Sequence, residues 1–237
     1  MLLEILLSSK NDIWSGILTF LVLFPVLLFS LSAHEYGHGF AAYTQGDGYA
    51  KMMGRLSLNP FKHLDPWGTL SMLLFGFGWA KPVPIVPTSF KNGRKSMIIV
   101  SLAGITVNLI LAIIALFLWY FFRYLILANV AWFVSTTAGI LVSSILLNVL
   151  SYTVQINIAL AVFNLVPIPP LDGYKFFKEI FIGKISYNFF LNFERYSTFI
   201  LIGFLLIGDR TNFISSVSGF IYDLMIKVMD LIFIAFV

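Results

Sequence analysis

The chain has 237 residues, of which 59% are hydrophobic and only 11% are charged, and its net charge is +4. Soluble domains are about 45–50% apolar and about 25% charged, so this composition excludes an ordinary water-soluble protein. The absence of cysteine excludes disulfides and thiolate metal sites. No clustered basic face of a soluble module is visible, so we expect no nucleic-acid partner.

Several apolar segments are long enough to cross a lipid bilayer, which takes about 20 residues in a helix. They cover residues 13–43, 96–122, 130–166, 186–207 and 213–237. The last segment carries Asp223, Lys227 and Asp230, so it is either amphipathic at the surface or packed within the bundle. We predict an all-α polytopic membrane protein with about five to six transmembrane helices.

The segment between the first two apolar runs is mixed in character. Alternation from Met53 to Leu58 indicates a short strand. The run "KPVPIVP" at residues 81–87 is extended, because closely spaced prolines cannot continue a helix. Trp67 to Trp79 is apolar but short, which is typical of a re-entrant or partial helix. We therefore expect a short β-hairpin or re-entrant element after the first helix.

Basic residues set the expected orientation. The loop over residues 45–95 contains Lys51, Arg55, Lys62, Lys81, Lys91, Arg94 and Lys95. The positive-inside tendency puts this loop in the cytoplasm. The next helix then goes out and the following one returns, so the turn "VPIPPLDG" reaches the membrane face where the first helix ends. We expect a multi-pass protein of the cell membrane, with Asp172 near His34 and His38 on the cytoplasmic side.

Two of the three histidines, His34 and His38, stand four residues apart at the end of the first apolar run, with Glu35 between them. Positions i and i+4 share a helix face, so both imidazoles can bind one tetrahedral zinc ion. Glu35 lies beside them, where it can take a proton from water that zinc makes acidic. The alternative is that the histidines are interfacial or helix-packing residues. However, an acidic group and two histidines in a membrane need a partner or a function.

A catalytic zinc takes three protein ligands and keeps one position open. Thr44 stands where a metzincin has its third histidine, which excludes that class. The remaining candidates are His63, Asp47, Asp65 and Asp172. The first three are typical of loops and turns, whereas Asp172 ends an inbound segment on the correct side. Taken alone, its Asp-Gly pair is also typical of a turn or a helix N-cap.

These motifs resemble those of the site-2 protease family of intramembrane zinc metalloproteases. The matching pieces are "AHEYGHGFAAYTQGD", "GRLSLNPFKHLDPWGTL", "GWAKPVPI", "NIALAVFNLVPIPPLDG" and, more weakly, "SLAGITVNLILA". They follow the family's order over most of residues 33–173. The resemblance implies that His34, His38 and Asp172 bind one zinc ion per chain and that Glu35 is the catalytic base.

The resemblance also implies that Asn164 helps to hold the substrate or the oxyanion. An interhelical hydrogen bond is the alternative for this residue, since Asn commonly makes one within a membrane. The chain departs from the family at Ile105, where Pro is usual, and at Tyr174, where a small residue is frequent. We expect a compact form without a PDZ-like or nucleotide-sensing domain.

The expected protein is one integral-membrane metalloprotease domain over residues 1–237, with a catalytic core of about 13–185 and C-terminal helices of about 186–237. It hydrolyses peptide bonds in transmembrane segments of a membrane-spanning protein substrate. Residues 53–58 and 81–87 could hold the unwound substrate by edge pairing, and the alternative is that they form an ordinary membrane-surface loop.

Two other functions remain open. One is a metal-binding membrane transporter, although the chain has no second copy of the histidine cluster. The other is a non-catalytic scaffold, which has no need of Glu35. The sequence makes no prediction of the oligomeric state.

Overall fold

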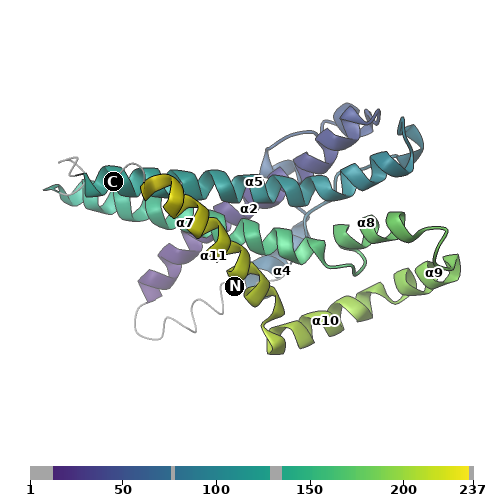
Figure 1. The fold of residues 1–237 in the computed structure, drawn as a ribbon. Helices are drawn as coiled ribbons and strands as arrows, with labels where there is room; N and C mark the ends of the chain where they lie inside the picture. The colour runs from purple at the N-terminus through teal and green to yellow at the C-terminus, as the bar shows by residue number, and fades with distance from the viewer. Residues whose placement is uncertain (1–12, 76–77, 129–134, 235–237) are drawn as a thin grey trace.

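The computed structural model of the chain describes residues 13–75, 78–128 and 135–234. Three long helices form its centre: α2 (Ile13–Thr44), α5 (Arg94–Leu127) and α7 (Thr137–Leu165), seen in Figure 1. Each is long and apolar enough to cross a bilayer. Because α5 packs against α2 and α7, and α2 also contacts α7, the three helices form one bundle. The predicted class, an all-α polytopic protein, is therefore confirmed.

The C-terminal region adds a bent pair of helices. Helices α9 (Tyr187–Arg195) and α10 (Ser197–Thr211) are bent by 67° relative to each other, at a break next to Tyr196. Within the residues that the structure describes, three helices can cross a membrane by length and composition, or up to four if this bent pair is one span. The expected five to six transmembrane helices are therefore not confirmed.

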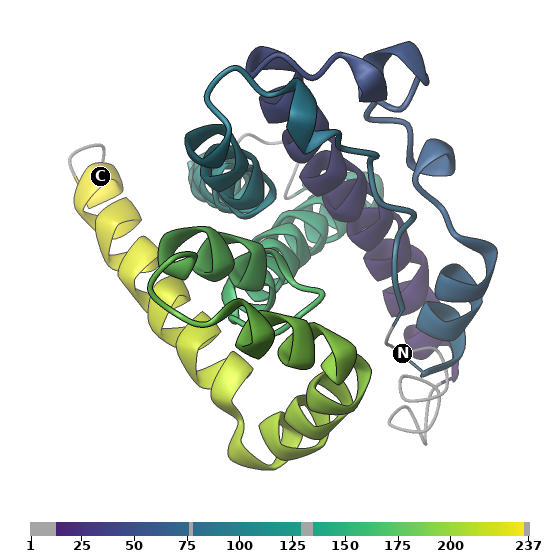
Figure 2. The same ribbon diagram turned by 90° about the vertical axis from the view of Figure 1, so that its right-hand side faces the viewer.

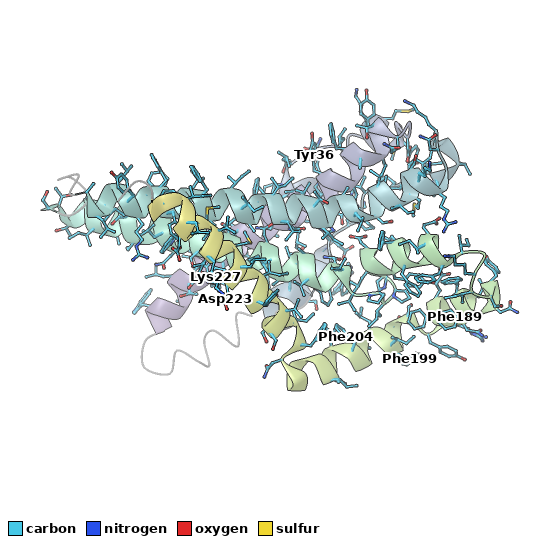
Figure 3. The ribbon with its side chains drawn as sticks, viewed as in Figure 1. Tyr36, Phe189, Phe199, Phe204, Asp223 and Lys227 are labelled. Atoms are coloured by element: carbon cyan, nitrogen blue, oxygen red, sulfur yellow. The ribbon has the colours of Figure 1, made fainter. Side chains whose placement is uncertain are left out.

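The last helix, α11 (Phe213–Ile234), packs onto the bundle through one apolar side. Its contacts with α5 and α7 involve Ile214, Val217, Ile221, Met225, Ile226 and Met229. Asp223 and Lys227 are exposed on this helix (Figure 3), whereas Asp230 accepts a hydrogen bond of 2.6 Å from the hydroxyl of Tyr120 on α5. The helix is therefore packed against the bundle, and its exposed side carries apolar residues such as Phe220 and Leu231 beside these two charges.

The segment between α2 and α5 lies on the side of α2 away from α11, as Figure 2 shows. It contains α3 (Tyr49–Met52), α4 (Pro66–Phe75) and the 3-10 turns Pro60–Lys62 and Pro87–Ser89. Ten residues in α4 are too few to cross a bilayer, so α4 is a partial helix as expected.

The predicted strand at residues 53–58 is absent. The chain turns at Gly54, whose φ is +64°, and the N–H groups of residues 53–55 donate to carbonyls three to five residues earlier. These local bonds use donors that a strand would offer to a neighbour. The described ranges contain only two isolated β-bridges, Leu64–Ala80 and Ile182–Ile185, so the predicted β-hairpin is not present there.

The turn that carries Asp172 follows α7 directly. Helix α7 ends at Leu165, because Pro167 and the prolines after it cannot continue a helix. Helix α8 (Asp172–Phe181) then begins with Asp172 in its first turn and contacts α5. A Cβ at Gly173 would lie 2.1 Å from the carbonyl oxygen of Leu165, so only glycine allows this close return of the chain.

Candidate metal centre

The structure brings His34, His38 and Asp172 together in one buried cluster. The two Nε2 atoms are 3.1 Å apart, and Oδ2 of Asp172 lies 3.0 Å from Nε2 of His34 and 2.8 Å from Nε2 of His38. The histidines are one turn apart on α2, and the carboxylate comes from the first turn of α8. Three side chains with nitrogen or oxygen donors thus converge at one point of the bundle.

Each imidazole is oriented through its other nitrogen. Nδ1 of His38 is 2.7 Å from the carbonyl oxygen of Val100, which can only accept, so this nitrogen carries the hydrogen. Nδ1 of His34 faces Oδ1 of Asn108, another acceptor. In both rings the lone pair is therefore on Nε2, toward Asp172. Metal-binding histidines have this arrangement, in which the second ring nitrogen donates to an oxygen.

The donor set fits a zinc ion. Two neutral Nε2 atoms and a carboxylate oxygen face one another with their lone pairs, an arrangement that a bound cation would stabilise. Two histidines and one carboxylate are a ligand set of catalytic zinc sites, in which ligand atoms about 2.0 Å from the ion stand about 3.3 Å apart. The observed separations of 2.8–3.1 Å are close to that value. The carboxylate also offsets part of the ion's charge in a low-dielectric site.

Helix α5 approaches the two imidazoles through Gly104. A Cβ at this position would lie 2.5 Å from Cε1 of His34 and 2.6 Å from Nε2 of either histidine, closer than any real Cβ contact. Val100, Gly104 and Asn108 are spaced by four residues, so they share the face of α5 toward the cluster. None of the three was predicted from the sequence as part of the site. The feature of the sequence that could have identified them is the four-residue spacing of Gly104 and Asn108 within an apolar helix.

Asp172 uses its two oxygens differently. Oδ2 faces the histidines, and Oδ1 accepts a hydrogen bond of 2.8 Å from Nζ of Lys175. Lys175 places a positive charge beside Oδ1, which favours the carboxylate form of Asp172. A metal ligand must have this form.

Glu35 follows His34 on α2 and is half-buried. Its Oε2 accepts a hydrogen bond of 2.7 Å from the N–H of Val83, which belongs to the proline-rich segment 81–87. Oε1 has no hydrogen-bond partner among the described residues. One oxygen of this carboxylate is thus fixed by the backbone, and the other is available.

Arg55 and Asp47 hold the proline-rich segment in place. Nη2 of Arg55 donates to the carbonyls of Lys81 and Pro82, at 2.8 and 3.2 Å. Oδ2 of Asp47 accepts from the N–H of Val86 at 2.6 Å. The N–H of Val83 therefore meets Glu35 from a segment that is tied down on both sides.

The other candidate ligands lie outside the cluster. Asp47 and Asp65 each accept a backbone N–H within their own turns, from Tyr49 and Gly68. His63 is buried, and its Nε2 is 2.7 Å from the carbonyl oxygen of Ser57, so it holds the loop.

Asn164 donates from Nδ2 to the carbonyl of Leu160 at 3.0 Å, a bond within its own helix. This is not the interhelical hydrogen bond considered as the alternative for Asn164. The role of Asn164 toward substrate stays a prediction.

The two departures from the family pattern lie beside the site. Ile105 is buried on α5, which continues through this position as an unbroken helix. Tyr174 is buried and donates a hydrogen bond of 2.9 Å to Oε1 of Glu194, which ties α8 to α9. Burial, followed by this hydrogen bond, raises the pKa of Tyr174 above its usual range. Neither residue interrupts the cluster.

Comparison with protein families identifies the class. The model of peptidase family M50 matches residues 22–208, which is most of the chain. The chain belongs to this family, the family of the site-2 proteases.

Two groups of relatives are similar in sequence. YwhC of Bacillus subtilis is 42% identical over 154 residues, which cover 65% of this chain and 66% of YwhC. Rip2 of Mycolicibacterium smegmatis is 31% identical over 160 residues, which cover 65% of this chain and 55% of that protein. Rip2 of Mycobacterium tuberculosis is 32% identical over 152 residues, which cover 62% of this chain and 52% of that protein. All carry the provisional name of zinc metalloprotease. The chain thus spans between about half and two thirds of these relatives. No solved structure gives a significant match.

Proposed function

We propose that this chain is an intramembrane zinc metalloprotease that hydrolyses peptide bonds in transmembrane segments of membrane-spanning proteins. His34, His38 and Asp172 bind one zinc ion per chain, and Glu35 is the catalytic base. The observation that carries the proposal is the convergence of three buried side chains that can donate lone pairs to a metal, next to this glutamate in the sequence and within a bundle of membrane-length helices. The family and the names of the relatives support zinc as the metal.

Zinc in such a site supplies Lewis-acid chemistry, since it polarises a scissile carbonyl and makes water acidic enough to attack at neutral pH. Glu35 performs the proton transfers. The N–H of Val83 holds its Oε2, so Oε1 takes the proton of the attacking water and then delivers it to the leaving amine. Val83 thus fixes the direction in which the carboxylate acts.

The substrate must unwind before it can react, because a helix hides its amides. We propose that the unwound segment lies along residues 81–87, beside Glu35, and pairs with the backbone of this segment. The absent strand at 53–58 has no part in this proposal. Asn164, close in sequence to the turn with Asp172, is proposed to hold the substrate or its oxyanion.

The proposed location is the cytoplasmic side of the cell membrane, because the loop over residues 45–95 is basic. A transporter or a scaffold would use the same polar residues without cleaving a peptide bond. Peptide hydrolysis that depends on the metal therefore separates the enzyme from both alternatives.

We expect the purified chain in detergent to cleave a test protein with a single transmembrane segment. Removing zinc with a chelator should abolish cleavage, because the carbonyl then lacks its Lewis acid, and adding back zinc should restore it. Fragments are measured by mass spectrometry and the metal content is measured in the same samples. Unchanged cleavage by protein shown to be free of metal would contradict the proposal.

A further inference from the structure

A line of buried polar side chains leads from His34 into the apolar bundle. Oδ1 of Asn108, on α5, faces Nδ1 of His34. Nδ2 of Asn108 donates to Oδ1 of Asn157, on α7, at 2.7 Å. Nδ2 of Asn157 donates to Oγ of Ser30 on α2 and to the carbonyl of Thr153, both at 2.8 Å. Both asparagines and Ser30 are 0% exposed, so water cannot replace any of these partners.

The carbonyl of Thr153 gives this line a direction. A carbonyl oxygen only accepts hydrogen bonds, so Asn157 must turn its NH₂ group toward Thr153. Its oxygen then faces Asn108, which must offer its own NH₂ group in return. The remaining oxygen of Asn108 is left for His34. Any other orientation of either amide would bring two like groups together in a buried place, which is costly.

This direction decides which nitrogen of His34 carries the hydrogen. With an oxygen opposite, Nδ1 must be the donor, and Nε2 keeps the lone pair that a metal needs. If Asn108 rotated its amide, its NH₂ group would favour the other tautomer, in which Nε2 carries a hydrogen and cannot bind a metal. His38 needs no such control, because the main-chain carbonyl of Val100 fixes its tautomer directly.

We infer that Asn108 and Asn157 are positioning residues of the proposed zinc site: Asn157 fixes the orientation of the Asn108 amide, and Asn108 fixes the metal-binding tautomer of His34. The inference rests on the proposed zinc site. Both residues act through His34 and are not among the three proposed metal ligands. Loss of such an outer partner typically weakens metal binding by about 10–100-fold.

The test measures the zinc dissociation constant of full-length variants in detergent by competition with a chelator. Asn108→Leu and Asn157→Leu should each weaken binding by about 10–100-fold. Asn108→Asp should bind zinc more tightly than Asn108→Leu, because a carboxylate presents an oxygen to His34 in either orientation, although its other oxygen then faces the oxygen of Asn157. Asn157→Leu removes that oxygen, so it should not weaken zinc binding in the Asn108→Asp background.

Two control variants distinguish a loss of the amide orientation from a general loss of packing. Ser30→Ala removes one partner of Asn157 but leaves the carbonyl of Thr153, so binding should stay within about twofold of wild type. Asn148→Leu changes an exposed asparagine of α7 and should have no effect. Weaker binding in Asn157→Leu that persists unchanged in the Asn108→Asp background would overturn the inference, as would Asn108→Asp binding as weakly as Asn108→Leu.

Nitrogen NMR of the imidazoles in metal-free protein determines the tautomer of His34 in the wild type itself. It should find a hydrogen on Nδ1 of His34, and a ring with its hydrogen on Nε2 alone overturns the inference. The signal is assigned by its loss in His34→Gln. If the wild type binds no zinc, the proposed function fails, whereas normal zinc binding with the wrong tautomer defeats only this inference.

Discussion

Glu35→Gln is expected to abolish cleavage of a transmembrane substrate while zinc stays bound. Glutamine keeps an oxygen for the N–H of Val83, so the shape of the site is preserved. It cannot accept a proton, and general acid–base catalysis is typically worth about 10²–10⁴-fold in rate. The loss is measured as kcat/KM for the appearance of fragments, together with the zinc content of the variant.

A matched control comes from Glu179→Gln on α8, a half-buried carboxylate outside the cluster, which should cleave at the wild-type rate. Equal cleavage by the wild type and Glu35→Gln would remove the proteolytic mechanism. Cleavage lost together with zinc would instead mean that Glu35 supports metal binding.

Asp172→Asn is expected to have the second large effect, on zinc affinity. The substitution keeps the size of the side chain but removes the negative charge that stands 2.8–3.0 Å from both Nε2 atoms. Loss of an outer partner alone costs about 10–100-fold in affinity, so losing a charged ligand should cost more than about 100-fold. Zinc affinity is measured by chelator competition, and cleavage is measured at low and at high zinc concentrations.

Activity should recover in part at high zinc, because the defect is in binding and Glu35 is intact. Asp223→Asn removes an exposed carboxylate of α11 and serves as the control. A zinc dissociation constant unchanged by Asp172→Asn would show that the metal, if bound, lies elsewhere.

Much of the site can be predicted from the sequence because the residues that carry its chemistry are rare in this chain. Two histidines in helical register with a glutamate stand out against an apolar segment. The distant partner Asp172 follows from counting positive charges in loops, since orientation decides which turns meet. The structure brings these side chains together, and their roles in binding and catalysis are proposals.

The rest depends on tertiary packing, which a single sequence does not express. The alternation at Met53–Leu58 is typical of a strand, yet local hydrogen bonds at Gly54 turn the chain instead. The break near Tyr196 separates one apolar run into two helices without a proline to indicate it. The sequence shows Asn108 and Asn157 as polar residues within apolar helices, and such residues need hydrogen-bond partners in a membrane. Which partners they find is decided by how α5 and α7 pack.

The measurement that tests the central claim most directly is zinc K-edge X-ray absorption on the zinc-loaded wild type, with the metal content determined in the same sample. We predict one zinc per chain, with scattering from two imidazole nitrogens at about 2.0–2.1 Å and one carboxylate oxygen at about 2.0–2.2 Å. His38→Ala should lose one imidazole from this spectrum or lose the metal. A spectrum without imidazole scattering, or one unchanged in His38→Ala, would contradict the account.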